Sequence, residues 1–96
     1  MRSAYADIAA EHEAIRTRWG DQHHPTGAHR GFALVRRLLQ YLCDRAARRG
    51  RKTWRHILIE EVFEVLAEPA DREAMRAELV QVGAVVVSMI EDLDRN

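Results

Sequence analysis

Apolar residues recur every three or four positions along most of the 96-residue chain, which is the period of an amphipathic α-helix. The first such run predicts a helix from about Ser3 to Arg18, with Ser3 as its N-cap. Its apolar face consists of Tyr5, Ile8, His12, Ile15 and Trp19. Residues 20–31 are rich in glycine, histidine and other polar residues, so we expect a long loop there.

Two further runs predict the second and third helices. The second has its apolar face at Phe32, Val35, Leu39, Leu42 and Ala46. It ends with arginines before Gly50, an arrangement typical of a helix carboxyl terminus. Thr53 is a suitable N-cap for the third helix, which we expect to run to about Ala67, until Pro69 interrupts it.

The last predicted helix begins near residues 69–71 and continues to about Leu93. It is apolar on two sides, with Met75, Val82, Val85 and Met89 on one and Val80, Ala84 and Val87 on the other. Such a helix is expected at the centre of a fold or at a subunit interface. Because no strand-like alternation is long enough to predict a strand, we expect one all-α domain over residues 1–96, arranged as a four-helix bundle.

Composition places the chain among globular proteins, because 47% of its residues are hydrophobic and 31% are charged. Its only cysteine, Cys43, cannot form an internal disulfide, so we expect a reduced, cytoplasmic protein. The position of Cys43 in an apolar stripe favours a core residue over a nucleophile. The longest apolar run, residues 82–87, is far shorter than the roughly 18 residues of a membrane span, so no membrane partner is predicted.

The net charge of zero conceals two parts of opposite charge. Residues 1–55 contain 12 Lys or Arg and 5 Asp or Glu, whereas residues 56–96 contain 3 and 10. A basic part that faces an acidic part suits a site that holds a polyphosphate and a metal together, because each needs the opposite sign of charge. The alternative is that the charges only help two helical hairpins to dock.

Four glutamates gather on one face of the third predicted helix: Glu60, Glu61, Glu64 and Glu68. At about 100° per residue they span an arc of about 100° that contains no Lys or Arg. Like charges at these spacings repel one another by a few tenths of a kcal/mol per pair. The compensating positive charge must therefore come from another part of the chain or from a ligand.

A further glutamate, Glu78, lies on the last predicted helix among apolar residues at helical spacing, so we expect its carboxylate to be buried. If the last two helices pack antiparallel across a short turn, Glu78 faces Glu61 and Glu64. Three converging carboxylates, with water in the remaining positions, suit Mg²⁺. The alternative is an acidic surface face together with a Glu78 that meets an arginine.

These acidic motifs carry a resemblance to a known family. Glu61-x-x-Glu64 is followed, after thirteen residues, by Glu78-x-x-Gln81. This order resembles the Glu-x-x-Glu and Glu-x-x-Asp signature of the MazG-like, all-α nucleoside triphosphate pyrophosphohydrolases. Segments 54–68 and 76–95 are similar to the metal-binding and closing helices of that family, and segment 11–25 is similar to its amino-terminal part.

The resemblance implies an enzyme that uses Mg²⁺, or Mn²⁺ in its place, to hydrolyse a nucleoside triphosphate to a monophosphate and pyrophosphate. It implies Glu61, Glu64 and Glu78 as metal ligands, with Gln81 acting directly or through water. Gln81 stands where the family has an Asp, and its uncharged amide lowers the expected metal affinity. Glu60, Glu61 and Glu64 are the expected catalytic residues, with Glu60 orienting or deprotonating the attacking water. The resemblance also implies a homodimer or tetramer.

Four other residues are candidates for substrate binding. Lys52 and Arg55 precede the acidic helix and are expected to hold the triphosphate, whereas Trp19 and His24 are expected to contact the nucleobase. The basic segment 45–55 also has the composition of a nucleic-acid patch, although a solvated turn explains most of its side chains. The neutral overall charge disfavours a dedicated nucleic-acid binder.

The sequence allows two other interpretations. Asp21, His23, His24 and His29 are potential metal ligands, but their spacing matches no zinc pattern. The alternative to an enzyme is a catalytically weak or inactive MazG-like helical module that binds a nucleotide, a nucleic acid or a protein partner.

Overall fold

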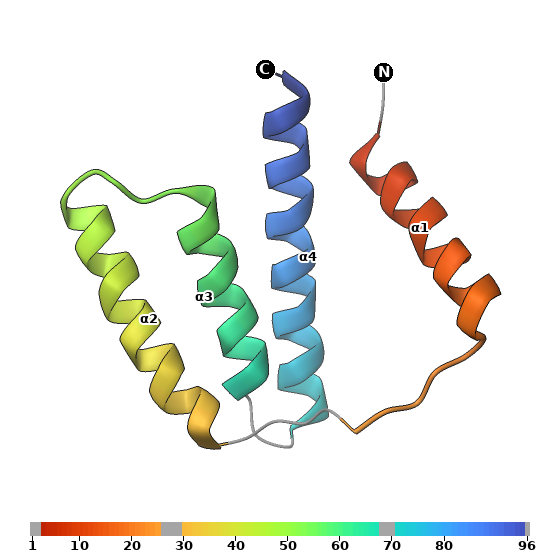
Figure 1. The fold of residues 1–96 in the computed structure, drawn as a ribbon, viewed down its shortest axis with the longest axis horizontal. Coiled ribbons are helices and arrows are strands. Elements are labelled where there is room, and N and C mark those ends of the chain that lie inside the picture. Colours follow the sequence, from red (N-terminus) through yellow and green to blue (C-terminus); the bar gives the residue numbers. More distant parts are fainter. Residues whose placement is uncertain (1–2, 26–29, 68–70, 96) are drawn as a thin grey trace. The chain divides into compact units, whose positions relative to one another are not determined.

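A computed structural model describes residues 3–25, 30–67 and 71–95, and within these ranges the chain forms four helices and no strand. They are α1 (Ala4–Trp19), α2 (Arg30–Arg48), α3 (Trp54–Ala67) and α4 (Arg72–Arg95), shown in Figure 1. The prediction of an all-α fold with four helices is confirmed. The chain divides into two compact units, one of Met1–Thr26 with Val87–Asn96 and the other of Gly27–Val86.

Helix α1 belongs to the first unit and has well-defined ends. The predicted N-cap is confirmed, because the Ser3 hydroxyl accepts a hydrogen bond from the Ala6 N–H at 3.3 Å. At the other end Gly20 has φ 69°, in the left-handed region, and its N–H donates to the Arg16 carbonyl at 2.8 Å. Ala4 is buried, whereas Trp19, on the predicted apolar face, is 63% exposed.

Helices α2 and α3 pack against each other as an antiparallel hairpin in the second unit (Figure 1). Two contacts join α2 to α3, one towards each end of the hairpin. The rings of Phe32 and Phe63 meet edge to face with centroids 6.3 Å apart, and the Cys43 thiol donates to the His56 carbonyl at 3.5 Å. Cys43 is 1% exposed, which confirms its prediction as a core residue.

The turn between α2 and α3 begins at Gly50, whose φ of 66° only glycine adopts without strain. The Gly50 N–H donates to the Ala47 carbonyl at 3.0 Å, and the Arg51 N–H donates to the Ala46 carbonyl at 2.7 Å. This pair of bonds forms a Schellman motif, which satisfies the last carbonyls of α2. The predicted end of the second helix before Gly50 is therefore confirmed.

Helix α4 begins after Asp71, whose carboxylate accepts hydrogen bonds from the N–H groups of Glu73 at 3.0 Å and Ala74 at 3.2 Å. Pro69, expected to separate the last two helices, and Glu68 lie outside the described residues. One predicted apolar face is partly buried, at Met75, Val82, Val85 and Met89. The other face is uneven, because Val87 is buried and Val80 is 57% exposed.

Candidate functional site

The acidic motif lies on α3, where residues three and four apart share a face. Glu60, Glu61 and Glu64 are all partly buried. Their helix starts at a cap and has no basic residue in its last turn. Three carboxylates are thus held close together along little more than one helical turn.

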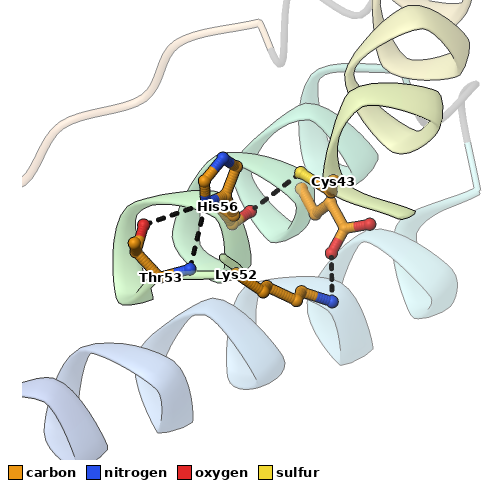
Figure 2. Close-up of polar contacts among 5 residues, drawn as sticks. Cys43, Lys52, Thr53 and His56 are labelled. Atoms are coloured by element: carbon orange, nitrogen blue, oxygen red, sulfur yellow. Dashed lines mark hydrogen bonds and ion pairs between the residues drawn. The ribbon is translucent and has the colours of Figure 1, made fainter. Parts of the chain in front are cut away.

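Lys52 supplies part of the positive charge that the sequence left unexplained. Its ammonium lies 3.4 Å from the Glu60 carboxylate, with side chains that are 34% and 20% exposed (Figure 2). Lys52 was expected at the triphosphate and Glu60 at the attacking water, and the structure brings these two residues together with each other. The lysine therefore has to leave Glu60 if it is to bind a phosphate.

Glu61 is the carboxylate with the most unusual surroundings. Its Oε2 atom exposes less than 1 Å² to solvent and has no hydrogen-bond partner among the described residues. Burial raises the pKa of the Glu61 carboxyl above its ordinary value of 4.5, and the carboxylates of Glu64 and Glu60 raise it further. The site therefore favours either a proton or a cation at Glu61.

Glu78 and Gln81 lie one turn apart on α4. Glu78 is partly buried as predicted, and its Oε2 atom exposes less than 1 Å², whereas Gln81 is exposed. Within residues 3–25, 30–67 and 71–95, no three or more His, Cys, Asp or Glu residues are gathered closely enough to hold a metal ion. The convergence of Glu61, Glu64 and Glu78 stays a prediction, because helical spacing fixes a face and not a distance between helices.

The start of α3 contains a cap of which the sequence predicted one residue. Thr53 is the N-cap, as predicted, but the imidazole of His56 completes it. The His56 Nδ1 accepts from the Thr53 N–H at 3.0 Å and lies 2.9 Å from the Thr53 hydroxyl (Figure 2). Thr-x-x-His has the spacing of a capping box, with histidine in place of glutamate or glutamine, and that spacing was the available signal.

Cys43 lies beside this region but is enclosed. Burial raises the pKa of the Cys43 thiol, the charges of Glu60 and Asp44 raise it further, and Lys52 partly opposes them. The thiol is therefore protonated at neutral pH, which matches its role as a donor to the His56 carbonyl.

The remaining candidates have different surroundings. Arg55 is exposed at the start of α3. Trp19 and His24 belong to the first unit, where His24 Nε2 lies 3.4 Å from the Gln22 side-chain oxygen, and their expected contact with a nucleobase stays a prediction. A shallow hollow of about 370 Å³ in that unit is lined by His12, Ile15, Arg16, Gly20, Asp21 and Gln22. Of the potential zinc ligands, His29 lies outside the described residues.

None of the helices within the described residues of the chain combines the length and apolar character needed to cross a membrane. No protein-family model, curated protein or solved structure matches the chain.

Proposed function

We propose that the protein is a divalent-cation-dependent nucleoside triphosphate pyrophosphohydrolase, which releases a nucleoside monophosphate and pyrophosphate. The observation that carries the proposal is the Glu61 carboxylate, with one oxygen shielded from solvent and without a hydrogen-bond partner among the described residues. Two further carboxylates crowd it and raise its pKa. A carboxylate in such surroundings costs free energy unless a cation or a proton neutralises it.

The donor set suits Mg²⁺, a hard cation that prefers oxygen ligands and retains several waters. Glu61 and Glu64 would hold it from α3, and Glu78 from α4, with Gln81 as a direct or water-mediated ligand. The bound ion would supply charge neutralisation at the phosphate oxygens and polarise a water molecule.

The residues of the chain would then carry out the hydrolysis itself. The Glu60 carboxylate would accept a proton from the attacking water as the water oxygen bonds to the α-phosphorus and the bond to the bridging oxygen breaks. Lys52 and Arg55 would bind the departing pyrophosphate, because their positive charges complement it. Since Lys52 holds Glu60 at 3.4 Å, its transfer to a phosphate would free Glu60 as a base only when substrate is present.

The decisive experiment measures Mg²⁺-dependent pyrophosphate release from a panel of ribo- and deoxyribonucleoside triphosphates. We expect Glu64→Gln to lower the rate by at least about 100-fold, because the variant loses a charge at the metal while keeping the side-chain size. Glu11→Gln, the same change at an exposed position of α1, is the matched control. Hydrolysis that survives Glu64→Gln, or wild-type protein that hydrolyses no nucleotide in the panel, would refute the proposal.

A non-catalytic module is the second candidate, and the exposed basic turn favours it. Arg45, Arg48, Arg49 and Arg51 are exposed around the end of α2. Such a surface can neutralise nucleic-acid phosphates, with binding that weakens steeply as salt increases. DNA or RNA binding of this kind, without nucleotide hydrolysis, would favour the module over the enzyme.

A further inference from the structure

The cap at the start of α3 depends on one imidazole ring. The Nδ1 atom of His56 lies 3.0 Å from the Thr53 backbone nitrogen and 2.9 Å from the Thr53 hydroxyl (Figure 2). A backbone N–H can only donate, so Nδ1 must accept from it and the ring proton must be on Nε2. The cap therefore requires the neutral imidazole in this one tautomer.

A second proton on the ring removes the acceptor. Imidazolium carries an N–H at both nitrogens, so Nδ1 can then donate to the Thr53 hydroxyl but can no longer accept from the Thr53 N–H. Positive charge at the start of a helix is also unfavourable, because the helix dipole already places partial positive charge there. Both effects weaken the first turn of α3 over the mildly acidic range in which imidazoles gain a proton.

The charges around His56 do not decide its protonation by themselves. The Glu60 carboxylate, one turn further along α3, attracts a proton, but the Lys52 ammonium pairs with it at 3.4 Å. From α2, the helix that packs against α3, the Cys43 thiol stays uncharged because its pKa is raised. The charged groups of this region are Lys52, Arg55 and Glu60 from the turn and α3, and Asp44 from α2, and their formal charges sum to zero. The hydrogen bonds of the ring therefore determine the outcome.

The first turn of α3 also covers the Cys43 thiol. Cys43 is 1% exposed, and its thiol donates to the His56 carbonyl at 3.5 Å. In the same turn the Ile57 N–H donates to the Thr53 carbonyl at 3.2 Å, so both ends of this bond adjoin the cap. Unwinding of the turn would remove the acceptor of the thiol together with part of its cover.

We propose that His56 is a proton-sensitive cap, which in its neutral form holds the first turn of α3 closed and which, when protonated, opens the turn and exposes Cys43. The stabilisation is present above the pH range in which imidazole titrates and is lost as pH falls through that range. The proposal does not depend on the proposed hydrolysis, in which neither His56 nor Cys43 has a part.

Hydrogen exchange of the Thr53 and Ile57 amides, measured by NMR on the full chain, tests the cap. Between about pH 7.5 and about pH 5.5, protection relative to the unfolded rates should fall about fivefold, the size of effect expected from the loss of one helix cap. His56→Gln is the matched control, since glutamine at this position of a capping box accepts the same bond and does not titrate. Protection in this variant should not change over the same range, and circular dichroism checks that it folds.

Labelling of Cys43 with a dipyridyl disulfide, which reacts with thiols in mild acid, tests the exposure. Wild type and His56→Gln should react at equal rates at about pH 7.5, and wild type should react about fivefold faster at about pH 5.5. Protection that falls without faster labelling would overturn the exposure of Cys43.

Three results of the exchange experiment would overturn the cap itself. Equal losses of protection in wild type and His56→Gln would assign the pH dependence to carboxylates instead of the imidazole. Wild-type protection that does not change with pH would show that protonation leaves the turn closed. Full protection in His56→Ala at about pH 7.5 would show that the ring does not hold the turn.

Discussion

Helix α3 presents two regions with different physical character. Towards α2, Phe63 meets Phe32 and the His56 carbonyl accepts from Cys43, so every described contact there is apolar or hydrogen-bonded. On the acidic face, Lys52 pairs with Glu60, while Glu61 keeps a shielded oxygen without a hydrogen-bond partner among the described residues. The contacts of the first region stabilise the fold. In the second region the shielded Glu61 carboxylate costs free energy, which a bound cation would offset.

Removing an aromatic ring from the packed region should produce the largest effect on stability. Phe63→Ala should lower the free energy of unfolding by about 3 kcal/mol, because it removes buried apolar area and leaves a cavity beside Phe32. Chemical denaturation followed by circular dichroism measures the change. Phe63→Leu is the control and should recover most of the loss. A loss below about 1 kcal/mol would mean that the two rings contribute little to the hairpin.

Neutralising a carboxylate of the acidic face should instead stabilise the protein. Glu61→Gln should raise the free energy of unfolding at pH 7 by about 1 kcal/mol, because a shielded carboxylate no longer has to be ionised. The pKa of Glu61 is raised on folding, so its protonation favours the folded state. The cost is therefore absent below the ordinary value of 4.5 and develops as pH rises through the raised value.

The gain from Glu61→Gln should accordingly shrink towards zero as pH falls to 4.5. Thermal unfolding at several pH values measures this dependence. Added Mg²⁺ should stabilise the wild-type protein and not the variant, if Glu61 is a ligand. A variant that is less stable than wild type at pH 7 would show that the carboxylate already has a favourable partner.

The ion pair on the acidic face should have the smallest effect. Lys52→Ala should lower the free energy of unfolding by less than about 1 kcal/mol, since both side chains remain partly solvated. Combining it with Glu60→Gln in a double-mutant cycle isolates the coupling, which should decrease with added salt. Additive effects would show that the two charges do not interact in solution.

The helices themselves follow from the sequence. The apolar period predicted all four, and their ends followed from local chemistry at Ser3, Gly50 and Thr53, where the structure shows the corresponding bonds. His56 was missed because imidazole is an uncommon partner in a capping box. The burial of Cys43 was also predictable, since it lies on the apolar stripe of α2.

The sequence by itself determined which residues share a helical face, because that depends only on the regular rotation per residue. Only the tertiary structure decided what each face meets. It paired Lys52 with Glu60 and shielded Glu61 from solvent. These outcomes depend on how the turn and the helices fold in space, and spacing along the chain does not specify them.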